Sequence, residues 1–309
     1  MPLTIPRAYS LEADGLSQSL IQTCMTCPRK FLFRINGYTS KAPMSSAITF
    51  GNIMHEALEM LYRDVGYDRC NLHGIDEIIE KACTSFPSDD TEIHKAKSTA
   101  LLEEYVNIYR SDFNGKSFIE LEREFDLPYS TGDLKVMRRG KIDGVFETKG
   151  KLWLIEHKTK SRIDEDGLML QLSFDFQNLF YVTVAEELYQ KEVAGVLYNV
   201  IRTPEHRQGH GESLEEFTQR LGKEIRKAPD HFFKRYEVPY TQKDKQEFII
   251  ELNYKLNTLR RFFSDGCFFR NQNACDSKYG TCEFLTACAT GRMITLKKDK
   301  LFPELTCGL

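Results

Sequence analysis

The chain has 309 residues, 41% of them hydrophobic, and a formal net charge of −3 at pH 7. A chain of this size and apolar content can bury a complete core. The balanced charge argues against a protein that binds nucleic acid only through a global basic surface. The first residues lack an apolar signal segment and no apolar run is long enough to span a bilayer, so we expect a cytoplasmic protein without membrane association.

Helical patterns dominate the first third of the chain. Residues 17–35 predict an early helix that Pro28 breaks or bends, because proline cannot supply the backbone hydrogen bond of a helix interior. Residues 51–65 carry apolar side chains at helical spacing, and residues 91–111 have a helical pattern as well. We therefore expect a helical part before the first strand.

Strand patterns begin in the middle of the chain. Residues 117–129 alternate between apolar and polar, and residues 141–147 and 152–158 predict a β-hairpin that turns at 148–151. A helical pattern at 176–190 and a further strand at 192–202 follow. This order predicts an α/β fold with a mixed β-sheet core flanked by helices.

The hairpin carries the most informative side chains of the sequence. Because side chains alternate along a strand, Glu156 and Lys158 share one face while His157 points the other way. Antiparallel pairing would bring Asp143 beside Glu156. Two carboxylates at neighbouring positions of paired strands repel each other unless a cation lies between them. A solvated hairpin with a cross-strand ion pair is the alternative interpretation of the same pattern.

In its context, this hairpin resembles the PD-(D/E)XK nuclease superfamily, and in particular its RecB-like branch. The resemblance depends on the short interval between the acids, the lysine two residues after the second acid and the sequence motif IEHKT at residues 155–159. Ile142-Asp143 stands at the usual Pro-Asp position. It covers about residues 20–290 and implies a restriction-endonuclease-like sheet. The implied activity is a metal-dependent DNA nuclease, an exonuclease of DNA recombination, repair or phage DNA processing.

The same resemblance assigns roles to individual residues. It implies that Asp143, Glu156, the backbone carbonyl of His157 and the side chain of His55 hold Mg²⁺ or Mn²⁺. Lys158 would orient the attacking hydroxide and stabilise the charge that develops on the phosphate. For His55 the alternative is a structural role, because a single histidine on a helix has a structural role more often than a ligand role.

Two further elements match the family in the expected order. Gln177 and Tyr181 are four residues apart on one helix face and would border the active centre and contact DNA. Gln171 competes for the glutamine position but lacks a tyrosine four residues later. Glu122 stands where the family often carries an additional acid on the preceding strand, and an exposed strand glutamate is the other interpretation.

Nine cysteines in a cytoplasmic chain call for a metal or redox explanation before a disulfide one. Cys275, Cys282 and Cys288 lie in a short, turn-rich tail. The resemblance to AddB-type and CRISPR-associated exonucleases adds Cys27 and implies a [4Fe–4S] cluster that ties the two ends of the chain together; Zn²⁺ is the alternative. Cys24 and Cys267 are alternative ligands for Cys27 and Cys275, and for the remaining cysteines we expect buried free thiols: Cys70, Cys83 and Cys307.

We expect one nuclease domain over residues 1–309. Its parts would be an N-terminal helical part (20–115), a nuclease core (116–240) and a C-terminal helix with the cysteine tail (241–309). The expected partners are DNA, as single strands or duplex ends, and a recombination or replication protein, in a bacterial cell or phage-infected host. The other function classes are a catalytically silent nucleic-acid-binding or assembly protein and a zinc-stapled interaction module.

Overall fold

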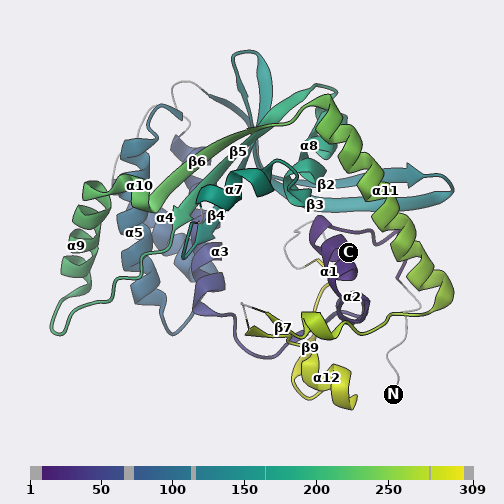
Figure 1. The fold of residues 1–309 in the computed structure, drawn as a ribbon. Helices are drawn as coiled ribbons and strands as arrows, with labels where there is room; N and C mark the ends of the chain where they lie inside the picture. Colours follow the sequence, from purple (N-terminus) through teal and green to yellow (C-terminus); the bar gives the residue numbers. More distant parts are fainter. Residues whose placement is uncertain (1–8, 66–72, 113–115, 164, 278–279, 303–309) are drawn as a thin grey trace. The chain divides into compact units, whose positions relative to one another are not determined.

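The computed structural model describes residues 9–65, 73–112, 116–163, 165–277 and 280–302 (Figure 1). The chain forms two compact units that alternate along the sequence. One consists of residues 1–43, 124–141 and 242–309, and the other of residues 44–123 and 142–241. The consecutive parts expected from the sequence, with boundaries near 115 and 240, remain a prediction about domain organisation. No helix among the described residues has the length and apolar character needed to cross a membrane.

A five-stranded mixed sheet runs through residues 117–239. Its strand order is β2-β3-β4-β5-β6, and two of the four boundaries between the units, at 123/124 and 141/142, fall inside β2 and β3. β4 pairs antiparallel with β3 and parallel with β5, and β6 returns antiparallel to β5. The strands are β2 (Ser117–Thr131), β3 (Leu134–Thr148), β4 (Lys151–Lys160), β5 (Val193–Arg202) and β6 (Phe233–Pro239). The parallel pair needs a crossover, which the helices between β4 and β5 supply.

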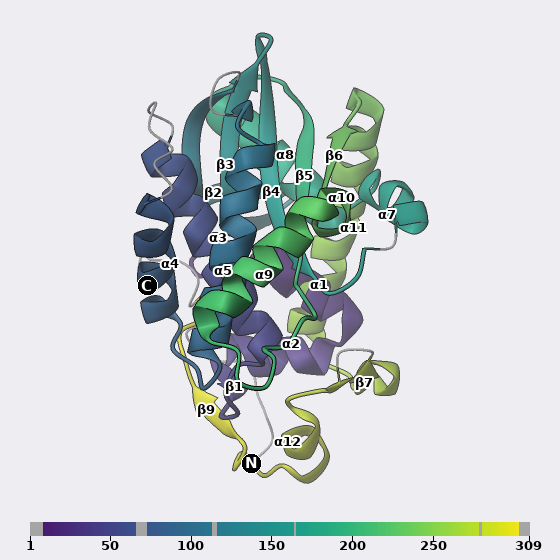
Figure 2. The same cartoon turned by 90° about the vertical axis from the view of Figure 1, so that its left-hand side faces the viewer.

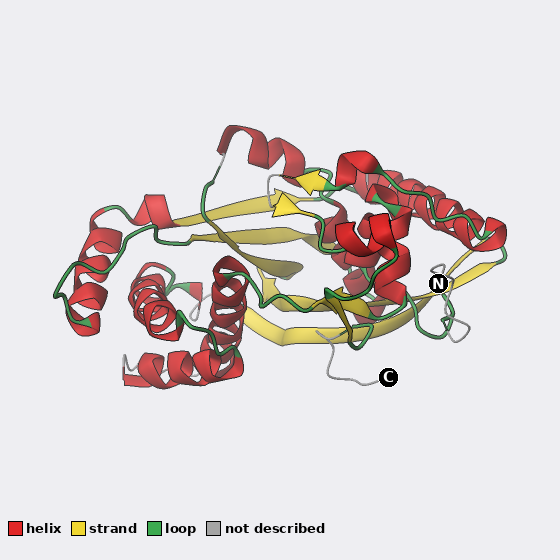
Figure 3. Cartoon of the chain, turned by 90° about the horizontal axis from the view of Figure 1, so that it is seen from below, coloured by secondary structure: helices red, strands yellow, loops and turns green. Residues whose placement is uncertain are grey.

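Helices of the unit that contains residues 44–123 and 142–241 cover both faces of this sheet. α5 packs against α4 and α9, as Figure 2 shows, and α8 packs against β5. Figure 3 shows the helices in red and the strands in yellow. Asp175 starts α8 by accepting a hydrogen bond from the Asn178 N–H at 2.8 Å. The helices of this unit are α3 (Ser46–Val65), α4 (His73–Ser85), α5 (Thr91–Ile108), α7 (Glu165–Leu172), α8 (Phe176–Tyr189), α9 (Leu214–Lys227) and α10 (Pro229–Phe232).

The core of this unit explains why β4 is the central strand. Leu152, Leu154 and Ile155 are at most 2% exposed although they point to opposite faces of the sheet. Ile155 belongs to the core shared with α3, α5 and α9, while Leu154 lies on the other face. A strand that is apolar on both faces is covered on both faces. The charged end of β4 therefore emerges from a rigid, buried scaffold.

The other unit combines the two ends of the described chain. β1 pairs antiparallel with β9, which places Thr39 opposite Lys297. Cys27 separates two short helices, and Pro28 is the first residue of the second one, as the sequence predicted. The elements are α1 (Gln18–Thr26), α2 (Pro28–Ile35), β1 (Tyr38–Ser40), α11 (Gln242–Asp265), the 3₁₀ turn η1 (Gln272–Ala274), β7 (Asp276–Ser277), β8 (Gly280–Thr281), α12 (Leu285–Thr290) and β9 (Leu296–Lys298).

The predicted fold class is confirmed, because the structure contains a mixed five-stranded sheet flanked by helices. The hairpin, its turn and the predicted helices before and after it all form. The sequence patterns missed α4, α7, α9 and β6. α7 and β6 are short, and length is the main signal that separates a helix or strand pattern from chance.

Candidate functional site

The β3–β4 hairpin brings the two acids together. Lys149 and Gly150 occupy the turn with φ of 50° and 73°, the left-handed values that a two-residue hairpin turn requires. The resulting register pairs Gly144 with Ile155. The next residues outward are Asp143 and Glu156, and the His157 N–H donates to Asp143 Oδ2 at 2.8 Å. The two carboxylates therefore start from adjacent positions on neighbouring strands.

Gly144 is needed for this close pairing. A Cβ at this position would lie 2.7 Å from Ile155 Cγ2 and 3.2 Å from Leu121 Cδ2. The first distance is shorter than any carbon–carbon contact that a packed core tolerates. A larger residue here would force the Ile155 side chain to shift beside Asp143.

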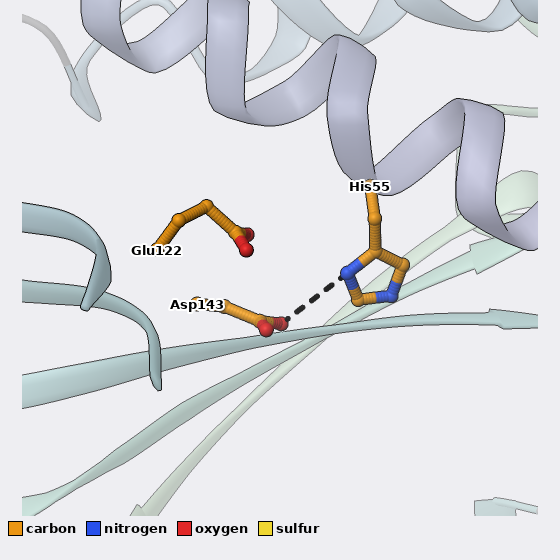
Figure 4. Close-up of side chains that lie close together, drawn as sticks. All are labelled: His55, Glu122 and Asp143. Carbon is orange, nitrogen blue, oxygen red and sulfur yellow. Dashed lines mark ion pairs between the residues drawn. The ribbon is translucent and has the colours of Figure 1, made fainter. Parts of the chain in front are cut away.

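One group of possible metal ligands gathers around Asp143. His55 comes from α3, Glu122 from β2 and Asp143 from β3, and their ligand atoms all lie within 4.8 Å of one another (Figure 4). His55 Nδ1 is 3.6 Å from Asp143 Oδ2. Among the residues that the structure describes, no other three His, Cys, Asp or Glu side chains meet this closely. Two carboxylates and an imidazole are a donor set suited to Mn²⁺ or Mg²⁺.

Glu122 reaches this group through an unusual backbone conformation. Its φ is 49°, in the left-handed region, within a strand that is otherwise extended. Such a value costs a non-glycine residue on the order of 1 kcal/mol and re-aims its side chain. Of the two interpretations of this glutamate, the structure places the side chain with His55 and Asp143 (Figure 4).

Glu156 belongs to a second, hydrogen-bonded group. Lys158 Nζ donates to Glu156 Oε1, which confirms that both side chains share a face. Gln177, from α8, joins them: its Nε2 donates to Glu156 Oε1 at 2.7 Å and its Oε1 accepts from Lys158 Nζ at 3.2 Å. The amide of Gln177 therefore bridges the acid and the lysine.

Burial and charge shift the pKa values of this group. Burial, together with the nearby Asp143 carboxylate, raises the pKa of Glu156 to about 7. Burial acts to lower the pKa of Lys158, but the charges of Glu156 and Asp143 outweigh it and raise that pKa. The lysine is therefore held as an ammonium, while one of two adjacent acids resists ionisation. A divalent cation would remove that resistance.

The remaining residues of the α7–α8 region lie in different surroundings. Tyr181 lies one turn after Gln177 on α8 and is buried, with its ring 6.0 Å from that of Phe180. Gln171 lies on α7 with an exposed side chain. The structure thus brings Gln177, and not Gln171, into contact with the acid and the lysine.

The side chain of His157 points away from this group into a buried network. Arg235 Nε donates to Asn199 Oδ1 at 2.8 Å, and Asn199 Nδ2 lies 2.9 Å from His157 Nδ1. Because a guanidinium only donates, the amide nitrogen of Asn199 must face the imidazole, which then accepts at Nδ1. Burial and the neighbouring His55 hold the pKa of His157 well below its ordinary value, so the ring is neutral.

Arg235 is itself held by acidic and phenolic groups. Asp112, which is 1% exposed, forms an ion pair with it at 2.6 Å. The hydroxyl groups of Tyr62 and Tyr105 accept from its Nη2 at 3.0 and 2.7 Å. The network therefore links the neutral ring of His157 to a charge-balanced buried pair.

The sequence interpretation missed Asn199 and Arg235. Asn199 interrupts an apolar strand, and a buried polar side chain in such a run needs a partner. That signal could have marked it. Arg235 gave no comparable signal, because its partners lie 36 or more positions away in the chain.

The four predicted cluster cysteines lie in one unit. Cys27 is buried between α1 and α2, and the other three are partly exposed in the tail: Cys275, Cys282 and Cys288. Burial and the nearby thiols of Cys27 and Cys275 raise the pKa of Cys288, against the lowering effect of two arginines. The Cys282 N–H donates to the Cys275 carbonyl at 2.8 Å.

The alternative cysteines differ clearly from these. Cys24 is fully buried, and burial raises the pKa of its thiol to about 12, so it is a poor thiolate. Cys267 is exposed. Cys83 is a buried free thiol, as expected, and Cys70 and Cys307 lie outside the described residues.

The described cysteine sulfurs are farther apart than the ligands of a closed tetrahedral zinc site. Zn–S bonds of about 2.3 Å place tetrahedral thiolates within roughly 4 Å of one another. No three described cysteine sulfurs lie within 4.8 Å of one another. A four-iron cubane binds each thiolate at a different iron and so accepts wider spacing.

Comparison with known proteins supports the interpretation of the hairpin. The sequence profile of the PD-(D/E)XK nuclease superfamily matches residues 15–289. No curated protein sequence matches the chain. Among solved structures, a "putative exonuclease" from Eubacterium rectale aligns over 100% of both chains with a TM-score of 0.51 and 13% identity. At that identity the likeness concerns the fold alone.

Two other solved structures align less well. The protein SSO0001 covers 88% of this chain and 95% of its own, with 15% identity and a TM-score of 0.28. The protein VC1899 from Vibrio cholerae covers 74% and 60%, with 12% identity and a TM-score of 0.20. Scores this low carry no argument about the present chain.

Proposed function

The chain belongs to the PD-(D/E)XK nuclease superfamily, and from this premise we propose that it is a divalent-metal-dependent DNA exonuclease. The observation that carries the proposal is the pair of groups at the hairpin. In one group the ligand atoms of His55, Glu122 and Asp143 lie within 4.8 Å of one another, and in the other Lys158 donates a hydrogen bond to Glu156. The two meet where Asp143 and Glu156 lie side by side.

In this proposal the acids and the imidazole hold the ion. Asp143, Glu156, the backbone carbonyl of His157 and the side chain of His55 would bind Mg²⁺ or Mn²⁺, with Glu122 as an additional ligand. The bound ion supplies a water of lowered pKa and neutralises charge on the scissile phosphate. The raised pKa of Glu156 fits this role, because a carboxylate buried beside another one gains most from a cation.

Lys158 supplies the remaining positive charge. Its ammonium is held by Glu156 and Gln177, so it needs little reorganisation when negative charge develops on the phosphate. Gln177 keeps the lysine and the acid at a fixed separation. Tyr181, on the same helix face, is buried, so we assign it to the border of the active centre behind Gln177.

The proposal is tested by incubating labelled single-stranded and duplex DNA with the protein and Mg²⁺ or Mn²⁺. We expect cleavage by the wild type and none above background by Glu156→Ala or Lys158→Ala, provided that both variants keep the wild-type circular dichroism spectrum. Release of mononucleotides identifies an exonuclease, and strands labelled at either end give the polarity. Failure of the folded, metal-supplied wild type to cut any DNA would overturn the proposal.

We further propose that Cys27, Cys275, Cys282 and Cys288 bind a [4Fe–4S] cluster, in the manner of the RecB-like branch. The support is the grouping of the four cysteines in one unit, three of them in the short tail that follows α11. The cluster would staple the two ends of the chain and take no part in hydrolysis. Anaerobically purified protein should show the broad visible absorption of iron–sulfur and about four irons per chain; stoichiometric zinc without iron would contradict the assignment.

The biological setting follows from the same premise. We propose a cytoplasmic protein of a bacterial cell or phage-infected host that processes DNA ends in recombination, repair or phage DNA processing. A recombination or replication protein would deliver those ends. Co-purification of the tagged protein from such cells, with and without nuclease digestion of DNA, tests whether a protein partner exists independently of DNA.

A further inference from the structure

A pocket opens at the turn end of the β3–β4 hairpin, in the unit that contains residues 44–123 and 142–241. Its volume is about 380 Å³, which is within the range of pockets that hold small ligands. The described residues that line it include three lysines, two large aromatic side chains and one glutamate. Neither Asp143 nor Glu156 is among them.

The pocket lies on the opposite face of β4 from Glu156 and Lys158. Trp153 lines the pocket three positions before Glu156, and side chains an odd number of positions apart on a strand point to opposite faces. β4 is paired with β3 on one side and with β5 on the other, so continuous backbone separates the two faces. A nucleotide held at Lys158 therefore cannot reach the pocket through the sheet.

The floor of the pocket is apolar and largely aromatic. Phe146 lies opposite Trp153 across the hairpin and is 2% exposed, and Leu197 of β5 is 4% exposed. The half-buried Trp153 ring extends to Gly195 on β5, where a Cβ would lie only 2.9 Å from Trp153 Cζ3. Glycine therefore leaves room for the indole. An indole beside a cavity offers a surface on which a flat ring can stack.

Two lysines without an acidic partner stand at the rim of the pocket. Lys149 and Lys151 flank the glycine of the hairpin turn, and both are exposed. No ion pair among the described residues involves either of them. By contrast, Lys191 pairs with Glu147 of the same hairpin at 2.9 Å. Unpaired ammonium groups beside a pocket can bind an anionic ligand through charge-assisted hydrogen bonds.

Lys116 adds a third positive charge. Its Nζ lies 5.7 Å from the centre of the Phe146 ring. Lys116 pairs with Asp112, but the same carboxylate also pairs with Arg235 at 2.6 Å, so one acid serves two cations. Within the described lining, Glu237 is the only acid, and it is exposed. The pocket therefore combines an apolar floor with an excess of positive charge.

We propose that this pocket binds a free nucleotide, with the base against Trp153 and the phosphate groups among the three lysines. An inorganic anion would leave the apolar floor uncovered, and an uncharged aromatic molecule would leave the lysines without a partner. A nucleoside diphosphate or triphosphate carries both parts, and its several charges match three lysines better than a single carboxylate does. The inference does not depend on the proposed nuclease function, and it gives the protein a second ligand away from Glu156.

The single tryptophan of the chain provides a signal from the pocket itself. Trp153 fluorescence is titrated, in chelator, with adenosine diphosphate and separately with its two parts, adenosine and pyrophosphate, and equilibrium dialysis measures bound nucleotide independently. We expect quenching by the diphosphate with a Kd on the order of 10⁻⁵ M, and about tenfold or weaker binding of either part. Equal affinity for pyrophosphate would reveal an adventitious anion site only. That result, or no bound nucleotide at millimolar concentration, would overturn the inference.

Lysine variants test whether the nucleotide is bound in this pocket. Lys149→Ala and Lys151→Ala should each weaken binding of adenosine diphosphate about fivefold and keep the wild-type circular dichroism spectrum, because both side chains are exposed. Lys191→Ala is the matched control, since it removes a paired lysine from the surroundings of the same hairpin, and should change the affinity less than about twofold. Equal losses in all three variants would reduce the effect to general surface charge and overturn the inference.

A terminal nucleotide of a DNA strand has the same chemistry as a free nucleotide, and competition separates the two sources. Oligothymidine and a 5′-phosphorylated duplex are added in excess to the complex with adenosine diphosphate, again in chelator to prevent metal-dependent cleavage. We expect the nucleotide to stay bound, because the pocket lies on the other face of the sheet from Lys158. Displacement of the nucleotide by DNA would assign the pocket to the DNA strand and overturn the inference.

Discussion

The carboxylate site and the cysteine-rich tail are both built from distant parts of the sequence, but the fold assembles them to different degrees. Around Asp143, the ligand atoms of three elements already lie within 4.8 Å of one another. The cysteines share a unit, yet no three of the described sulfurs come that close. The acids lie on long strands of the five-stranded sheet and the histidine on a long helix, whereas the tail cysteines lie in short elements and turns. Ligands on rigid elements are preorganised by the core, and ligands on turns need the metal to bring them together.

The largest effect should come from Lys158. Lys158→Ala removes the ammonium that the folded site holds ready, and we expect the cleavage rate to fall by about 10² to 10³-fold with little change in stability. Single-turnover cleavage at saturating Mg²⁺ measures this loss. Lys191→Ala is the control, because Lys191 is half-exposed and pairs with the surface acid Glu147. A loss below threefold for Lys158→Ala would show that the preorganised lysine does not take part.

Arg235→Met tests whether the buried network supports the carboxylate site. The change leaves Asp112 buried with Lys116 as its remaining cation and removes the group that orients Asn199. We expect a loss of about 3 kcal/mol in unfolding free energy. Calorimetry should also show about tenfold weaker Mn²⁺ binding, because His157 links the network to the site.

A matched control for this change lies in the same unit. Arg226 pairs with the buried Glu104 but is itself 66% exposed, and neither residue touches the site. Arg226→Met should cost less stability and leave Mn²⁺ affinity unchanged. Equal Mn²⁺ affinities of Arg235→Met and Arg226→Met would show that the buried network stabilises the fold but does not support metal binding.

Cys282→Ala should affect the cysteine-rich tail and not the carboxylate site. Loss of one cluster ligand is expected to lower the unfolding free energy by on the order of 2 kcal/mol, the size typical of a cross-link. The tail keeps other contacts to the N-terminal part, such as the stacked rings of Phe33 and Phe284 at 4.9 Å, so unfolding should not be complete. Mn²⁺ binding should be unchanged. Thermal unfolding measures the first effect, and a parallel loss of Mn²⁺ affinity would contradict the separation of the two regions.

A smaller effect is expected from pH. The pKa of Glu156 is about 7 in the folded protein against an ordinary 4.5, so the folded state binds its proton more tightly than the unfolded state does. Without metal, this contribution to stability is complete below about pH 4.5 and is lost as the pH rises through about 7. The stabilisation by Mn²⁺ should increase between pH 6 and 8, because the ion binds the ionised acid.

Denaturant titrations in chelator and in Mn²⁺ measure both trends. Glu156→Gln should remove the decline in stability of the metal-free protein between pH 5 and 8. A variant that keeps the full decline would show that another group titrates.

The sequence predicted the parts of the site that depend on local pattern. Alternation along β4 placed Glu156 and Lys158 on one face, and the turn at 148–151 set the hairpin. The position of Gln177 beside them came from the resemblance to the family and not from periodicity. The proposed roles of these residues remain predictions.

The rest depended on contacts that no local pattern encodes. Glu122 joins the group through a left-handed φ that glutamate rarely adopts, so alternation along the strand could not predict its direction. Arg235 and Asn199 meet His157 only when β5 and β6 are paired. The two interleaved units arise because β2 and β3 each cross from one to the other, which periodicity within a strand does not reveal.

Anomalous diffraction from crystals soaked with Mn²⁺ tests the central claim most directly. The claim is that the fold alone prepares a divalent-metal site at Asp143. We predict one strong anomalous peak at about 2.0 to 2.6 Å from carboxylate oxygens of both Asp143 and Glu156, with His55 or Glu122 completing the ligand set. The peak should be absent from crystals of Asp143→Asn. A fully occupied Mn²⁺ that binds elsewhere, or bound Mn²⁺ that does not contact Asp143, would contradict the account.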